Sequence, residues 1–118
     1  MVELMMDAFQ VLAELKRCLR NLASTAEQQL TYLGSLGAIS VDELALELDE
    51  ALDMLWIPTR HGLISEEQVE SVERVRSALR DLARPDHASL WSEQGLIVAR
   101  EWEHIRELAS NALECLDK

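Results

Sequence analysis

One stretch of the chain, Ser40–Trp56, constrains the fold more than any other. It holds six carboxylates and no basic residue. At about 100° per residue, its large aliphatic side chains fall on one narrow arc of a helix, made up of Val41, Leu44, Leu48, Leu52 and Leu55. The carboxylates spread over the opposite side, at Asp42, Glu43, Glu47, Asp49, Glu50 and Asp53. The stretch therefore predicts a helix with one face in the core and an acidic outer face.

The composition favours an all-α fold. The 118 residues fit a single domain, residues 1–118, and the low content of glycine (4), proline (2) and aromatic residues (4%) is typical of helical proteins. The 22 acidic and 11 basic residues give a formal net charge of −11. Such a charge repels nucleic acid and anionic membranes and favours a basic protein partner.

The first third of the chain predicts one long helix. Apolar residues recur at three- or four-residue steps from Leu4 to Leu33, and Gly34 follows them. Ser24–Glu27 has the form of a capping box, which is typical of a helix start, so a break at this point is the alternative. Acidic residues lie among the apolar ones near the N-terminus, which excludes a signal peptide and a membrane span there. A cytoplasmic protein is expected.

Two further capping boxes predict the next helices. Ser40–Glu43 starts the second helix, which is expected to end near Trp56 because Pro58 restricts the residue before it. A loop over residues 57–64 then leads to Ser65–Gln68, the start of a third helix that stops before Pro85.

The last third is less regular. Pro85–Ser89 is expected to be a linker, and Leu90–Gln94 a short helical turn that Gly95 interrupts. The final helix is expected from about Leu96, with its buried side chains at Val98, Trp102, Ile105, Ala109, Ala112 and Leu116. Short connections between four amphipathic helices predict an antiparallel four-helix bundle with a long N-terminal helix and a short extra helical turn before the last helix. Its core should be mostly leucine, with the tryptophans at the edges.

A row of arginines on the third helix needs an opposing charge. Arg76, Arg80 and Arg84 follow one another at four-residue steps, and like charges at this spacing destabilise a helix. They either pair with carboxylates of neighbouring helices or form a separate basic strip. In both cases Asp42 and Asp49, together with Asp53, are expected to remain free because they lie furthest from the core arc.

Signals for catalysis and metal binding are sparse. Glu101 and His104 form a Glu-x-x-His pair, which is typical of di-iron sites in helical bundles. Such a site needs a second pair and two more inward carboxylates, which the sequence lacks, and His104 lies off the apolar face. There is no phosphate-binding glycine loop, Cys-x-x-Cys motif or nucleophile elbow. No metal, no cofactor and no enzymatic activity are therefore expected.

The two cysteines, Cys18 and Cys115, lie in the first and last helices. They are expected to be buried free thiols, and a disulfide between the two helices is the alternative.

Leu46 falls in the middle of the acidic arc of the second helix. Together with Met54, Trp56 and the segment 57–58 it predicts an apolar centre rimmed by carboxylates, the anatomy of a protein interface. A single exposed leucine is also common without any function. The candidate partner-binding residues are Asp42, Leu46, Asp49, Glu50, Asp53 and Trp56.

The run Asp53–Pro58 resembles a segment of the nuclease-colicin immunity proteins, which has the pattern Asp-hydrophobic-hydrophobic-Tyr-Tyr-Pro. Here Trp56 and Ile57 replace the two tyrosines. As a small, acidic, helical chain, the protein is similar to the immunity proteins of nuclease-colicin and contact-dependent inhibition systems. The resemblance implies a protein that neutralises a toxin with a basic cleft by stoichiometric occlusion, as a monomer or weak homodimer.

Two alternatives use the same charges. In a homodimeric structural or regulatory adaptor, the arginine edge of the third helix would meet the acidic face of the second. In an acidic nucleic-acid mimic, the carboxylates would bind another kind of basic protein.

Overall fold

The computed structural model describes the backbone of residues 2–37 and 40–118 and the side chains of residues 8–37 and 40–118. Within these residues the chain is helical and has no strand, which confirms the all-α prediction. The elements in chain order are α1 (Val2–Ala23), α2 (Ala26–Ser35), α3 (Asp42–Asp53), α4 (Trp56–Arg60), α5 (Glu66–Leu82), the 3₁₀ helix η1 (Pro85–Leu90), α6 (Glu93–Val98) and α7 (Arg100–Leu116).

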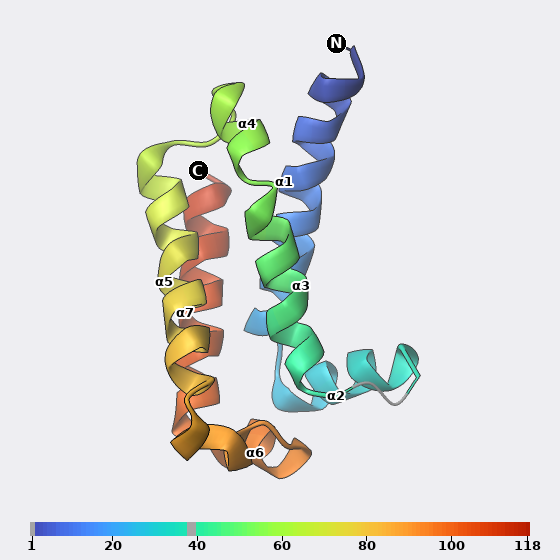
Figure 1. The fold of residues 1–118 in the computed structure, drawn as a ribbon, viewed down its shortest axis with the longest axis vertical. Helices are drawn as coiled ribbons and strands as arrows, with labels where there is room; N and C mark the ends of the chain where they lie inside the picture. Colours follow the sequence, from blue (N-terminus) through green and yellow to red (C-terminus); the bar gives the residue numbers. More distant parts are fainter. Residues whose placement is uncertain (1, 38–39) are drawn as a thin grey trace.

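The four longer helices, α1, α3, α5 and α7, run along the longest axis of a body of 45 × 29 × 25 Å (Figure 1). The short helices α2 and α6 lie at one end of it and α4 lies at the other. Helix α1 packs closely against α3 and α7, and α5 packs closely against α7, whereas α3 and α5 touch sparingly. The side of the molecule between α3 and α5 is therefore the least closely packed.

The first helix breaks after Ala23, so the alternative with a break is the correct one. The capping box lies one residue later than Ser24: Thr25 Oγ1 accepts from the Gln28 N–H at 3.1 Å, and the Gln28 side chain accepts from the Thr25 N–H at 3.0 Å. The next residue, Gln29, is completely buried and holds the break together.

Gln29 joins three parts of the chain. Its amide nitrogen donates to the carbonyl oxygens of Asn21 and Leu22, at 3.1 and 3.0 Å, in the last turn of α1, where carbonyl groups lack the usual partner four residues further on. Its amide oxygen accepts from Nε and Nη2 of Arg106 on α7, at 3.1 and 3.0 Å. Arg106 Nη2 also donates to the Leu96 carbonyl on α6 at 2.5 Å. Burial lowers the pKa of Arg106.

The start and end of α3 differ from the predictions. The capping box at Ser40 is wrong, because α3 begins at Asp42 after Val41, with no side-chain hydrogen bond at the cap. The helix ends at Asp53 rather than near Trp56, which instead begins α4 within the predicted loop. Pro58 is the third residue of α4, where a backbone N–H has no helical partner, so the proline is tolerated.

Helix α5 forms as predicted. Ser65 and Gln68 make both hydrogen bonds of the capping box, at 3.2 and 2.8 Å. The helix ends at Leu82, before Pro85, and buries the expected face, including Val72, Val75 and Leu79.

The last third is more helical than predicted. The 3₁₀ helix η1 replaces the expected linker, and α6 continues through Gly95. A Cβ at this buried glycine would overlap the backbone of Leu90, so the glycine permits η1 and α6 to pack together. Helix α7 begins only at Arg100, and Val98, expected on the buried face, is 63% exposed.

The core is rich in leucine, as predicted, but it also contains a tryptophan. Trp102 has no exposed surface, so its expected place at the edge is wrong. Its indole N–H donates to the Leu90 carbonyl at 2.8 Å, which satisfies the one polar group of the side chain. Trp91 packs edge-on against Trp102, with the ring centroids 5.1 Å apart. Among the described residues, no helix combines the length and the apolar character needed to cross a bilayer.

Candidate protein interface

The two faces of α3 differ as the periodicity predicts. Leu44, Leu48 and Leu52 are buried in the core, whereas Leu46 is 52% exposed on the opposite side. We call the residues around it the outer face of α3. It consists of Asp42, Leu46, Asp49, Glu50 and Asp53. An apolar side chain thus lies at the centre of four carboxylates.

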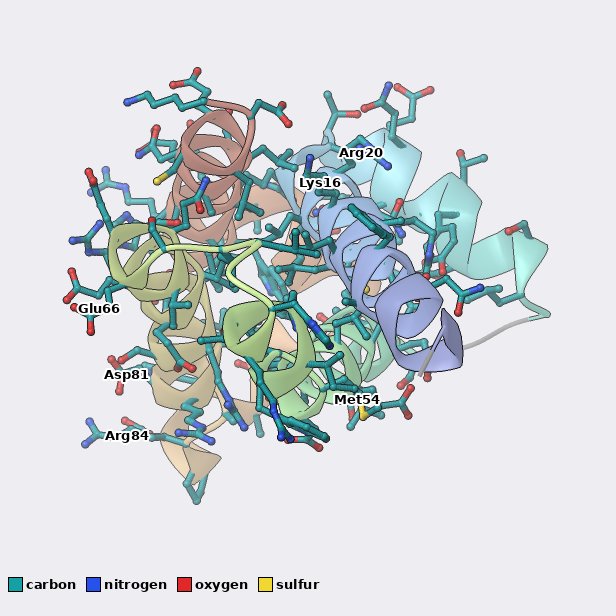
Figure 2. The ribbon with its side chains drawn as sticks, turned by 90° about the horizontal axis from the view of Figure 1, so that it is seen from above. Lys16, Arg20, Met54, Glu66, Asp81 and Arg84 are labelled. Carbon is teal, nitrogen blue, oxygen red and sulfur yellow. The ribbon has the colours of Figure 1, made fainter. Side chains whose placement is uncertain are left out.

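The expected apolar centre is smaller than predicted. Met54 and Trp56 are exposed, and Figure 2 shows Met54 at the surface of the molecule. Ile57 and Pro58 lie within α4 and are buried, so they do not contribute. Eight residues separate Leu46 from Met54, a rise of about 12 Å along a helix, so the exposed apolar side chains form two separate points rather than one patch.

Arg76 of α5 contacts the edge of the outer face. Its Nε lies 3.3 Å from Asp49 Oδ1 and its Nη2 3.8 Å from Asp53 Oδ1, while Nη1 lies 3.8 Å from Glu73 on the same helix. The expectation that Asp49 and Asp53 are free is therefore wrong, because α5 turns Arg76 towards α3. Both carboxylates are at least half exposed, so each pair contributes less than about 1 kcal/mol to stability.

A groove of about 550 Å³ lies between α3 and α5. One rim carries Asp42 and Asp49, and the other carries Arg76 and Arg80 of α5 and Arg84, which follows α5. Apolar side chains line its floor and its end, namely Ala45, Leu46, Leu79, Ala83, Pro85, Ala88 and Trp91.

Both predicted arrangements of the arginines occur, at different positions. Arg76 forms the ion pairs with α3, whereas Arg80 and Arg84 are exposed and make no ion pair within the described part of the chain. Arg84 extends from α5 away from α3 (Figure 2), so its charge lies at the outer margin of the groove. Asp42, on the other rim, also makes no ion pair among the described residues.

On the flank of α3 that faces α1, a polar cluster joins α3 to α1 and α2, and we call this the closed flank, although a smaller groove of about 380 Å³ lies further along it. Tyr32 of α2 donates its hydroxyl hydrogen to Glu47 Oε2 at 2.5 Å. Arg17 of α1 donates to the Tyr32 hydroxyl at 2.9 Å, and its Nη2 lies 3.5 Å from Glu47 Oε2. Arg17 also donates through two nitrogens to Glu14. The Glu47 side chain is 13% exposed, so this carboxylate serves the fold rather than the outer face.

These contacts shift several pKa values. The hydrogen bond from Arg17 holds the pKa of Glu14 below its ordinary value, and the same bond raises the pKa of Arg17. Burial, followed by the hydrogen bond to Glu47, raises the pKa of Tyr32. The cluster therefore favours charged Glu14 and Arg17 with a neutral Tyr32.

Both cysteines are free thiols, as expected, and no disulfide joins α1 to α7. Cys18 is buried beneath Glu47, and its thiol donates to the Glu47 carbonyl at 3.5 Å. Burial raises its pKa to about 12, so it stays protonated and unreactive at neutral pH. Cys115 is only half-buried.

The Glu-x-x-His pair lies at the opposite side of the molecule. Glu101 and His104 are exposed on α7 and line a hollow of about 170 Å³ with Asp81 and His87. Across the residues with described side chains, no three His, Cys, Asp or Glu side chains come close enough together to hold a metal ion.

The structure thus gathers five of the six candidate residues on the outer face of α3 and places Trp56 apart, on α4. The groove was not predicted, although the four-residue spacing of Arg76, Arg80 and Arg84 indicated that these side chains lie on one side of the molecule. The chain matches no protein-family model, and no similar protein was found among curated proteins or solved structures.

Proposed function

We propose that the outer face of α3 is the docking surface for a basic protein, and that the chain is an immunity protein that neutralises a toxin with a basic cleft. The observation that carries this proposal is Leu46, which is half exposed at the centre of four carboxylates. An apolar anchor within a polar rim is the usual anatomy of a protein interface.

The charges would act mainly on the rate of association. An acidic face on a chain with a net charge of −11 attracts a basic cleft at long range and speeds encounter by about 10- to 1000-fold at low salt. Leu46 would then slow dissociation by excluding water, and Trp56, on the neighbouring α4, would be a second apolar contact. The exposed ion pairs of Arg76 are weak enough for cations of the partner to replace them.

A rigid scaffold would support this mode of binding. We infer that α1, α3, α5 and α7 form an antiparallel four-helix bundle that is incompletely closed between α3 and α5. Their successive directions along the long axis in Figure 1 and the close packing of α1 on α3 and α7 support this description. In the bundle, α3 would hold its carboxylates in place before the partner arrives, as an occluding inhibitor in the cytoplasm requires.

The test uses the protein encoded by the neighbouring reading frame, expressed as a candidate toxin. We expect co-expression of the chain to restore growth and the purified pair to form a one-to-one complex. Asp42→Lys combined with Glu50→Lys should lower the association rate at least tenfold at low salt and flatten its salt dependence. These two positions leave the ion pairs of Arg76 intact.

The matched control is Glu107→Lys combined with Glu114→Lys, which makes the same charge change on exposed positions of α7. It should reduce the association rate much less. Equal losses for the two double variants would show that only net charge matters, and an unchanged rate for Asp42→Lys with Glu50→Lys would exclude this face.

A further inference from the structure

The two rims of the α3–α5 groove carry opposite charges at matching heights. Helices α3 and α5 run in opposite directions (Figure 1), and the ion pair between Asp49 and Arg76 fixes their register. Seven residues back along α3 from Asp49 is Asp42, a rise of about 10 Å. Seven residues forward from Arg76 is Ala83, the residue that caps the end of α5. Asp42 therefore lies level with a point between Arg80 and Arg84.

Three of these charged side chains lack an ion-pair partner in the part of the chain that the structure describes. Asp42, Arg80 and Arg84 make no ion pair among the described residues, although all three line the same groove. Beyond the ion pair between Asp49 and Arg76, the apolar floor, with the half-exposed Leu46, separates the acidic rim from the basic one. The groove thus presents an acidic row, an apolar strip and a basic row side by side.

We propose that this groove binds a second copy of the same chain. A two-fold axis parallel to the helices and lying in the plane of contact would place α3 of each copy over α5 of the other at the same height. Asp42 of one copy then lies between Arg80 and Arg84 of its partner, and the same contact occurs twice. Leu46 of each copy covers the apolar floor of the other. The occupant is thus identified by charge complementarity.

Opposing electrostatic effects make the dimer weak and make its salt dependence a poor test. The net charge of −11 on each copy opposes association at long range, whereas the paired rims favour it at short range. Salt screens both effects. Two variants with exchanged charges distinguish the long-range repulsion from the short-range pairing. Each variant alone places like charges opposite each other, whereas a mixture of the two pairs opposite charges again.

The experiment measures the mass of the intact chain by sedimentation at micromolar to submillimolar concentrations. The wild-type chain should form a dimer. Arg80→Glu with Arg84→Glu places like charges opposite Asp42, and Asp42→Lys places a cation opposite the two arginines. Each variant alone should dimerise at least about tenfold more weakly. An equimolar mixture of the two variants should restore the dimer, because both contacts then join opposite charges again.

Two further variants keep the test decisive. Arg74→Glu makes a similar change at an exposed position of α5 outside the groove, and it should leave the dimer intact. Should lysine at position 42 unfold α3, Asp42→Asn should still weaken the dimer without lowering the thermal midpoint.

Three results would overturn the proposal. They are a wild-type chain that stays monomeric throughout, variants that dimerise like the wild type, and a mixture that stays monomeric. The arginines take no part in the proposed docking of a basic protein, so Arg80→Glu with Arg84→Glu tests the dimer without removing the outer face of α3. Failure of the dimer would leave the proposed function standing.

Discussion

The two flanks of α3 carry similar carboxylates but use them differently. On the flank towards α1, Glu47 is almost buried and is held by Tyr32 and Arg17. On the flank towards α5, Asp49 is half exposed beside Arg76, and Asp42 faces an open groove. The acidity of a helix therefore does not by itself indicate a binding surface, because some of its carboxylates belong to the fold.

The difference arises from what each neighbouring helix supplies. Helix α2 supplies the Tyr32 hydroxyl, which donates to Glu47, and α1 supplies the Arg17 guanidinium, which lies 3.5 Å from the same carboxylate. Helix α5 brings Arg76 into ion pairs with α3, whereas Arg80 and Arg84 lie on the far side of an apolar floor. The closed flank should thus contribute to stability, and the open flank should contribute little to it.

The largest expected change in the free energy of unfolding comes from truncating a leucine on the inner side of α3 rather than one on its outer side. Leu48→Ala should lower the free energy of unfolding by about 3 kcal/mol, because Leu48 is completely buried and its loss leaves a cavity. Leu46→Ala should change it by less than about 0.5 kcal/mol. Urea denaturation of both variants measures the difference. Similar losses at the two positions would mean that Leu46 is packed rather than available to a partner.

A smaller effect is expected when one arginine on each flank of α3 is replaced. Arg17→Met should lower the free energy of unfolding by about 2 kcal/mol, since it leaves Glu47 almost buried without its cation. This value allows for the partial exposure of Arg17. Arg80→Met, on the open flank, should change the free energy by less than about 0.5 kcal/mol.

Urea denaturation at neutral pH also checks the arginine comparison. Tyr32→Phe, which removes the hydroxyl between Arg17 and Glu47, should cost about 1 kcal/mol. If Arg80→Met proved as costly as Arg17→Met, the contrast between the flanks would be lost.

The smallest expected effect is the change with pH in the contribution that Glu14, on the closed flank, makes to stability. Hydrogen bonding to Arg17 holds the pKa of Glu14 below its ordinary value of 4.5 in the folded state. Its contribution to stability is therefore present above pH 4.5 and is lost as the pH falls through the folded pKa. Because Glu14 is half exposed, the contribution is only a few tenths of a kcal/mol, roughly.

The measurement is the difference in unfolding free energy between the wild-type chain and Glu14→Gln. The difference should be constant near neutral pH and shrink below pH 4.5. In the background of Arg17→Met the difference should be small at every pH. A pH dependence that survives in this background would assign the effect to another group.

Local signals in the sequence were sufficient for some elements and not for others. Ser65 and Gln68 form their capping box as predicted, because both partners lie within one turn. At the end of α1 two boxes overlap, starting at Ser24 and Thr25, and local pattern favours neither. Tertiary bonds of Gln29, including those from Arg106, stabilise the observed break. The need for a glycine at position 95 likewise arises from the close packing of α6 on the backbone of Leu90. The hydrophobic periodicity of the sequence does not reveal that contact.

Some features of the candidate site were likewise predictable from local sequence, and others were not. The exposure of Leu46 follows from the helical period alone and was predicted correctly. The pairing of Arg76 with Asp49 and Asp53, and the groove beside it, depend on how α5 is rotated against α3. No short segment of sequence contains that rotation, because it results from how both helices pack on α1 and α7.

The bonds between Gln29 and Arg106 have a consequence for synthesis of the chain. On a ribosome, α1 and α2 emerge long before α7, so the amide oxygen of Gln29 must rely on water until residue 106 leaves the exit tunnel. The turn between the first two helices is therefore completed only after residue 106 has emerged. Until then the N-terminal half should remain accessible to proteases and chaperones.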